Sequence, residues 1–256
     1  MFRAELVFFY LNIIAEIGLL YRLIRCKLHR TYRSLFLYWL VQPIESLVLL
    51  TAGRQTWLYV YLYWGAQTLN IFMALYVVQD LFHIALAEHP AIASFGRRTV
   101  LVAMALAAAV TLAGITLDAT VLPGHFRTVQ RFATFERSMN FVILVFLLLI
   151  SILLLWFPIK VRRNIVVYIA GFVLFAASRS FGLLLANLLP QTAVFTVSTI
   201  LLALTLLCLL IWMVGIRPEG ERTTATPGYR RDPEAMQRLS RQLDSINATL
   251  ARFVRG

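Results

Sequence analysis

Seven long runs of apolar residues restrict the fold of this chain more than any other feature of its sequence. A helix needs roughly 20 mostly apolar residues to cross the hydrocarbon core of a bilayer. Seven stretches come close to that length: 5–24, 34–51, 58–82, 98–117, 138–157, 164–187 and 195–216. Charged residues make up only 14% of the chain, against about 25% in soluble globular proteins. We therefore expect an integral, multi-pass membrane protein in a cytoplasmic or plasma membrane.

The bilayer also selects the secondary structure of these runs. Hydrocarbon offers no hydrogen-bond partner, so every backbone N–H and C=O must be satisfied within the protein, as it is in helices and closed barrels. The alternation of apolar and polar residues that is typical of barrel strands is absent from the sequence. We predict an all-α fold in which residues 1–216 form a seven-transmembrane-helix bundle.

The basic residues predict which ends of the helices face the cytoplasm. Most of the 24 lysines and arginines lie in the first, third and fifth connections and in the tail after the last run. Cytoplasmic loops carry such an excess, so we expect the N-terminus outside and the C-terminus in the cytoplasm. This sidedness and attraction to anionic headgroups account for the net charge of +12. No nucleic-acid partner is expected, because no basic recognition module occurs.

Familiar cofactor and catalytic chemistry has no counterpart in the sequence. Covalent retinal needs a lysine in the last span to form a Schiff base, and the two lysines, Lys27 and Lys160, lie in predicted cytoplasmic connections. Asp80 and His83 share a helix face, but a metal site needs more ligands converging on one point. No serine elbow, phosphate loop or zinc-protease motif occurs. We therefore expect no cofactor, no metal and no enzyme activity.

Polar residues inside the predicted spans are the candidates for function, because such residues are costly in hydrocarbon. At a helical rise of about 1.5 Å per residue, the depth of each polar residue follows from its distance to the predicted outer end of its helix. By this measure, a group of six polar residues lies in the outer half of the membrane. The members are Asn12, Glu16, Glu45, Gln67, Asn70 and Arg179. They come from the first, second, third and sixth spans, and pairs spaced i,i+4 or i,i+3 share helix faces.

Two interpretations of this group stay open. In the first, it is a structural network in which Arg179 neutralises Glu45 or Glu16, because a buried arginine requires such a partner. In the second, it is a pocket open to the outside that binds a small ligand or ion. Two acids and one base leave one formal negative charge, which suits a proton, a cation or an amine.

The longest predicted outer segment runs from residue 118 to residue 137. Pro123-Gly124 marks a turn, and the apolar residues that follow recur at helical spacing. We expect an interfacial helix here that leads into the fifth span and caps the proposed pocket. This assignment leaves Glu136 outside the membrane.

The tail after the last span divides into two parts. Residues 217–231 combine proline, glycine, threonine and charge, which is typical of a flexible cytoplasmic linker. Residues 232–256 begin with a helix-start pattern, Asp232-Pro233, and carry apolar residues three and four apart. This seam consists of Met236, Leu239, Leu243, Ile246, Leu250 and Phe253. It predicts a cytoplasmic amphipathic helix that forms a coiled coil with copies of itself or docks on a membrane-protein partner.

The leading functional hypothesis is a non-enzymatic integral membrane sensor or accessory scaffold subunit. It is held as a homo-oligomer, or attached to a partner, by the C-terminal helix. The alternative is a small transporter or channel that uses the outer polar site around Glu16, Glu45 and Arg179. The two hypotheses differ in solute flux, which a transporter loses when Glu45 is neutralised.

Overall fold

The computed structural model describes residues 2–51, 57–117, 125–156, 161–188, 191–225, 238–239 and 241–249. Within these residues, each of the predicted apolar runs is a helix. The helices are α1 (Phe2–Arg25), α2 (Arg33–Thr51), α3 (Trp57–Ala85), α4 (Pro90–Leu117), α5 (His125–Trp156), α6 (Arg163–Leu188) and α7 (Gln191–Gly215). Shorter elements are the 3-10 turns η1 (Leu28–Arg30) and η2 (Pro218–Glu221) and the strands β1 (Val161–Arg162) and β2 (Thr224–Ala225).

The fold is all-α apart from the short β1–β2 ladder, and its helices have the length and composition of membrane spans. Among the described residues, 6 helices are long and apolar enough to cross a membrane, namely α1 and α3 to α7. These features are those of an integral, multi-pass membrane protein. The exception is α2, whose middle is interrupted by Gln42, Pro43 and Glu45.

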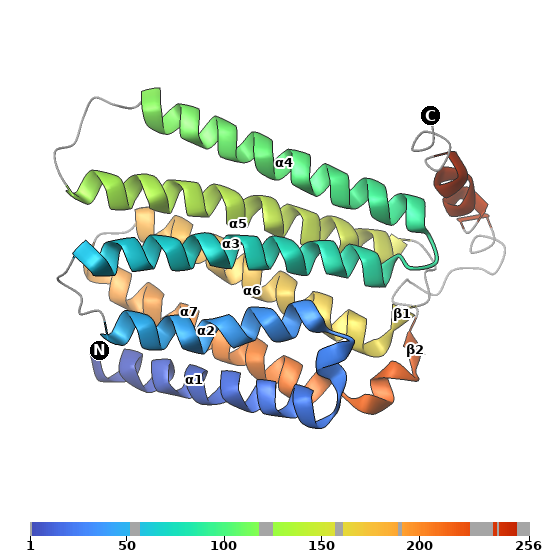
Figure 1. Ribbon diagram of the computed structural model, residues 1–256, viewed down its shortest axis with the longest axis horizontal. Coiled ribbons are helices and arrows are strands. Elements are labelled where there is room, and N and C mark those ends of the chain that lie inside the picture. Colours follow the sequence, from blue (N-terminus) through green and yellow to red (C-terminus); the bar gives the residue numbers. More distant parts are fainter. Residues whose placement is uncertain are drawn as a thin grey trace.

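Six helices form a closed ring, and α4 lies outside it. In Figure 1, α4 lies along the upper edge of the bundle. Around the ring, α1 contacts α2, α2 contacts α3, α3 contacts α5, α5 contacts α6, α6 contacts α7, and α7 returns to α1. The seventh helix, α4, packs on α3 and α5. Its outward side chains Leu106 and Val110 are exposed and apolar, which suits contact with hydrocarbon rather than water.

A layer of aromatic side chains fills the middle of the ring. Trp39 of α2, Phe175 of α6 and Trp212 of α7 are buried there, and the rings of Trp39 and Trp212 meet edge to face with centroids 5.4 Å apart. Gly171 permits this packing, since a Cβ at that position would lie 2.3 Å from the indole nitrogen of Trp212. The layer extends through Phe172 toward the end of the bundle at which α6 begins.

The connections rich in basic residues lie at one end of the bundle. Figure 1 shows η1, the α3–α4 turn, β1 and β2 together at the right, and the N-terminus at the left. The charge asymmetry of the sequence therefore maps onto two different ends of the same set of helices.

The first part of the tail differs from the expected flexible linker. Over residues 217–225 the chain forms η2 and then β2, which pairs antiparallel with β1 in the register Val161 to Ala225. Hydrogen bonds between backbone groups, such as that from Arg163 N–H to the Thr223 carbonyl, hold the segment against the bundle. The rest of the expected linker, residues 226–231, lies outside the described residues.

The expected interfacial helix is instead the start of α5. This helix begins at His125 and continues without a break to Trp156, so Glu136 lies within it and is only 3% exposed. The predicted fifth span, 138–157, left Glu136 outside the membrane, so its burial corrects that prediction. Burial of Glu136 is tolerated because a cation from another helix faces it.

Candidate functional site

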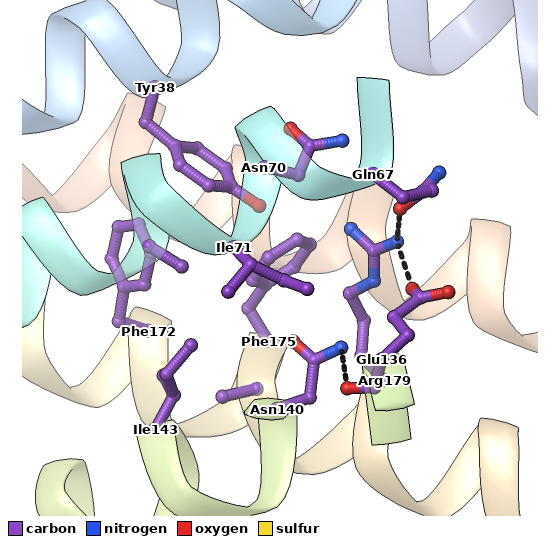
Figure 2. A pocket seen from close by; sticks show the side chains of 12 residues that line it. Tyr38, Gln67, Asn70, Ile71, Glu136, Asn140, Ile143, Phe172, Phe175 and Arg179 are labelled. Atoms are coloured by element: carbon purple, nitrogen blue, oxygen red, sulfur yellow. Dashed lines mark hydrogen bonds and ion pairs between the residues drawn. The ribbon is translucent and has the colours of Figure 1, made fainter. Parts of the chain in front are cut away.

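The cation that faces Glu136 is Arg179 of α6. Its Nη2 donates to Glu136 Oε1 of α5 over 3.3 Å and to Gln67 Oε1 of α3 over 3.2 Å; Figure 2 shows both contacts. The guanidinium also lies over the ring of Phe175, 5.8 Å from its centroid, a favourable cation–π position. Three helices of the ring thus meet at one half-buried arginine.

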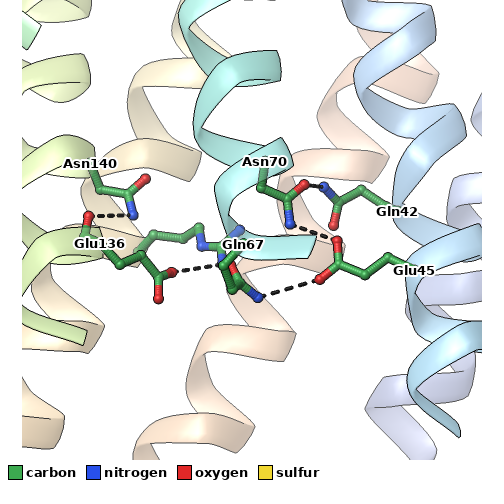
Figure 3. Close-up of polar contacts among 7 residues, drawn as sticks. Gln42, Glu45, Gln67, Asn70, Glu136 and Asn140 are labelled. Atoms are coloured by element: carbon green, nitrogen blue, oxygen red, sulfur yellow. Dashed lines mark hydrogen bonds and ion pairs between the residues drawn. The ribbon is translucent and has the colours of Figure 1, made fainter. Parts of the chain in front are cut away.

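A second branch of the network reaches Glu45 of α2. Gln67 Nε2 donates to Glu45 Oε1 over 3.4 Å, and Asn70 Nδ2 donates to Glu45 Oε2 over 2.6 Å. Gln42 in turn donates to Asn70 Oδ1 over 2.6 Å. Figure 3 shows the resulting run of polar contacts, which passes from α5 through α6 and α3 to α2. Gln67 is the link, because its oxygen accepts from Arg179 while its nitrogen donates to Glu45.

The ion pair differs from the one that the sequence suggested. We expected Arg179 to neutralise Glu45 or Glu16, but its salt-bridge partner is Glu136. In the described part of the chain, Glu45 and Glu16 form no ion pair with a cationic side chain. The network and the neighbouring Glu16 therefore hold three carboxylates and one guanidinium, a formal surplus of two negative charges rather than one. Such charges are costly in a bilayer unless a proton or a cation accompanies them.

Asn12 and Glu16 lie on the other side of α2 from the bond between Glu45 and Asn70. Asn12 Nδ2 donates to the carbonyls of Phe8 and Leu202, over 2.8 and 3.0 Å, and so ties α1 to α7. Glu16 is 6% exposed. Within the described residues, neither Glu16 Oε2 nor Asn12 Oδ1 has a hydrogen-bond partner. Of the six candidates, four are thus joined by hydrogen bonds, and these two form a separate pair.

Both unpartnered oxygens belong to residues that line a cavity of about 260 Å³ between α1, α2, α6 and α7. Arg179 reaches this cavity from α6, and the apolar part of the wall includes Phe9, Trp39 and Phe175. Further polar wall residues are Gln42, Ser46, Ser198 and Thr205. At about 30 Å³ per water molecule, the space holds several waters or a small organic molecule.

The space beside the ion pair itself is much smaller. A cavity of about 10 Å³ lies among Gln67, Asn70, Glu136, Asn140 and Arg179 (Figure 2). That volume is close to the minimum for one water molecule. The Arg179–Glu136 side of the network is therefore packed, whereas the Glu16 side has room for a ligand.

A different polar cluster lies at the end of the bundle that carries η2, β1 and β2. Glu221 of η2 accepts hydrogen bonds from the Tyr32 hydroxyl over 2.5 Å, from Asn164 over 2.7 Å and from Arg162 over 2.8 Å. Burial acts to raise the pKa of Glu221, but these three hydrogen bonds and the charge of Arg162 lower it below its ordinary value. Burial, reinforced by the Glu221 carboxylate, raises the pKa of Tyr32. Tyr32 therefore stays a hydroxyl donor.

The end of the tail docks on the start of α4. Residues 241–249 are helical, and Asn247 Oδ1 accepts from the backbone N–H groups of Ala91 and Ile92 over 3.1 and 3.3 Å. These groups have no partner within their own helix, so Asn247 caps α4 from outside. Leu243 is 4% exposed and belongs to the same buried apolar cluster as Ile92. His89 Nδ1 lies 3.9 Å from an Asp244 carboxylate oxygen.

This docking bears on the predicted oligomerisation seam. Leu243 is buried against its own bundle, Leu239 is half-buried and Ile246 is 46% exposed. Met236, Leu250 and Phe253 lie outside the described residues. One central member of the seam is therefore already covered in the single chain, and pairing with a second copy requires its release.

The sequence analysis missed several residues of the site. Gln42 has the i,i+3 spacing to Glu45 that marked the other pairs, and Glu136 has the i,i+4 spacing to Asn140, whose side chain donates to the Glu136 carbonyl. The small hydroxyl residues of the cavity wall carry no comparable pattern. Ser198, for example, lies between Thr196 and Thr199 with nothing to distinguish it from them. Its position in the cavity wall follows only from the packing of α7 on α1.

Comparison of the chain with protein-family models, curated proteins and solved structures found no match. Among the residues that the structure describes, no group of three or more His, Cys, Asp or Glu side chains is placed to hold a metal ion. The chemistry of the cavity and of the two polar clusters is what indicates function.

Proposed function

We propose that this chain is a non-enzymatic membrane sensor that binds a small organic amine in the cavity between α1, α2, α6 and α7. The observation that carries the proposal is the buried Glu16 carboxyl, which has an unpartnered oxygen and lines a cavity of about 260 Å³. In this proposal the ammonium group binds Glu16. The apolar part of the ligand packs against Phe9, Trp39 and Phe175 in the cavity wall.

The proposal places all seven helices across the membrane, with the N-terminus outside. For α2, support comes from the direction of its side chains. Gln42 and Glu45 bond to α3 inside the ring, whereas Ile44 and Leu47 are 54% and 59% exposed. Its outward face is thus apolar despite the polar residues, as a lipid-facing helix requires. The excess of basic residues at the opposite end supports a cytoplasmic C-terminus.

The charge balance favours a cationic ligand. Arg179 is engaged by Glu136 and Gln67, so Glu16 has no cation of its own among the described residues. An ammonium ion supplies the missing charge and up to three hydrogen-bond donors. Asn12 Oδ1, the other unpartnered oxygen, lines the same cavity and accepts one of those donors.

The aromatic layer favours a sensor over a channel. Trp39 and Phe175 line the cavity, and behind them Phe172 and Trp212 are buried, with ring centroids 5.0 Å apart. Close-packed rings leave no path for a solute from the cavity to the cytoplasmic end. A transporter, the alternative function, would have to open this layer in every cycle.

The same layer connects the cavity to the tail. Ring contacts run from Trp212 through Phe172 to Tyr168 and then to Tyr32, whose hydroxyl donates to Glu221. We propose that amine binding shifts the rings at the cavity wall and loosens the contacts of η2 and of the tail helix. The released tail helix then exposes its seam to a second copy or to a partner protein.

Hydrogen exchange in phosphatidylcholine nanodiscs tests this function, with phenethylamine as the probe and phenethyl alcohol as its neutral counterpart. We expect the amine, and not the alcohol, to speed exchange in residues 216–225 and 241–249. The variant Glu16→Gln should abolish the effect, whereas Glu88→Gln, which removes an exposed carboxylate, should keep it. An equal response in Glu16→Gln would contradict the proposal.

Flux separates the sensor from the transporter. Proteoliposomes loaded with radiolabelled phenethylamine should release it no faster than protein-free liposomes loaded in the same way. Neutralising Glu45 should leave this rate unchanged. Release that depends on the protein and is lost in Glu45→Gln would favour the transporter instead.

A further inference from the structure

A second hollow lies on the opposite side of α2 from the Glu16 cavity. It is a groove of about 340 Å³ between α2 and α3, and nearly all of its wall is apolar. Ile44 and Val48 of α2 and Leu62 and Leu69 of α3 form its sides. The side chains of Ile44, Val48 and Leu69 are exposed on the outside of the ring. The groove therefore opens to hydrocarbon when the bundle spans a bilayer.

One charged side chain lines this groove, and it is Glu45. Gln67 and Asn70 each donate one hydrogen bond to the carboxylate, but amides leave its charge in place. In the described part of the chain, Glu45 forms no ion pair. Each carboxylate oxygen has two lone pairs, so both can accept a further donor from the groove.

The dimensions suit a single alkyl chain. The groove extends from Val41 to Leu49 along α2 and from Tyr61 to Leu69 along α3, about 12 Å at the helical rise per residue. Its floor includes Gly65, where an added Cβ would find nothing within 4 Å. The missing side chain leaves room next to Glu45 in the wall of the groove.

We propose that the α2–α3 groove is a binding site, open to the bilayer, for a single-chain lipophilic amine. The ammonium group pairs with Glu45, and the alkyl chain lies on Ile44 and Leu69 and leaves past Val41 toward the centre of the bilayer. A neutral lipid chain fits the same walls but lacks the charge that Glu45 requires. The site is distinct from the Glu16 cavity and does not depend on amine binding there.

Saturation binding of radiolabelled dodecylamine to the protein in phosphatidylcholine nanodiscs tests the site, with empty nanodiscs subtracted. We expect saturable binding that unlabelled dodecylamine displaces and dodecanol does not. Glu45→Gln should weaken binding by at least about tenfold, because a hydrogen bond to a charged group contributes about 1.5–3 kcal/mol. Glutamine keeps the contacts with Gln67 and Asn70, so this variant should fold.

A second variant tests the groove without touching the charge. Gly65→Phe places a ring in the open space and should abolish saturable binding. Ala105→Phe adds the same bulk to the exposed face of α4 and should leave binding unchanged, as should Glu16→Gln. Loss of binding in Glu16→Gln would place the amine in the other cavity and overturn the proposal. Equal displacement by dodecanol, or full affinity in Glu45→Gln, would overturn it as well.

Discussion

The two polar clusters of this protein satisfy their acids in opposite ways. In the inner cluster, at the η2 end of the bundle, one carboxylate, Glu221, receives three hydrogen bonds, one of them from Arg162. In the outer cluster, Glu16, Glu45 and Glu136 share a single guanidinium, Arg179, and two of these carboxylates line hollows. A carboxylate whose hydrogen-bond and charge partners are all within the protein fixes structure. A carboxylate without a cationic partner retains the capacity to bind a ligand. The difference supports the proposal that the inner cluster attaches the tail and that the outer one binds a ligand.

The largest effect should come from breaking the one ion pair of the outer cluster. Arg179→Met leaves Glu136 buried without a cation, and loss of one partner of a buried pair costs about 3–5 kcal/mol. We expect that loss in the free energy of unfolding, measured by steric trapping in bicelles. Arg97→Met, which removes an exposed arginine of α4, should change it little. If Arg179→Met were as mild as this control, the pairing with Glu136 would be wrong.

Gly220 of the inner cluster and Gly65 of α3 offer a matched comparison. A Cβ on Gly220 would lie 2.1 Å from Asn164 Oδ1, whereas one on Gly65 meets nothing. Gly220→Ala should therefore cost about 1–3 kcal/mol of local stability through overpacking, seen as faster hydrogen exchange in residues 216–225. Gly65→Ala should be neutral or stabilising, because alanine favours helix. Equal effects of the two substitutions would contradict the close packing of η2.

The inner cluster should also weaken in acid. Because the pKa of folded Glu221 is below its ordinary value of 4.5, its contribution is fully present above that value. The contribution is lost as the pH falls through the lowered pKa. Protease cleavage of the tail should therefore accelerate below about pH 4 in the wild type. In Glu221→Gln the cleavage should be faster already at neutral pH and should respond less to acid; an unchanged acid response would exclude Glu221 as the titrating group.

The smallest effect concerns the tail helix. Asn247→Ala removes the cap on the first turn of α4, and loss of a cap costs about 1 kcal/mol. Exchange of the Ala91 and Ile92 amides should speed up accordingly, while Thr249→Ala, at an exposed position, should have no effect on them. If release of the tail frees the seam, Asn247→Ala should also raise the oligomeric fraction in detergent, and deletion of 232–256 should abolish it.

The sequence predicted the helices well because apolar runs of membrane length allow few other structures. It also predicted that Glu45, Gln67, Asn70 and Arg179 lie at a common depth, and the structure joins them by hydrogen bonds. Depth along a helix says nothing about direction around it, however. For that reason the sequence could not show that Glu16 faces a different side of α2.

The partner of Arg179 was hidden for a related reason. Hydropathy treats a charge at the edge of an apolar run as part of a loop, so Glu136 was assigned to the outside. A carboxylate enters the interior when a cation on another helix compensates it, and a single sequence does not reveal that pairing. The folded part of the tail was missed similarly, since its hydrogen bonds depend on Tyr32 and Asn164, which are far from Glu221 in the chain.

The central claim is that the Glu16 carboxyl holds an amine in the outer cavity. Calorimetric titration of phenethylamine into the protein in phosphatidylcholine nanodiscs measures this directly, with phenethyl alcohol and Glu16→Gln as controls. We predict one saturable site for the amine, at least about tenfold weaker binding of the alcohol, and a similar loss for the amine in Glu16→Gln. Equal affinity of the amine for wild type and Glu16→Gln would contradict the claim.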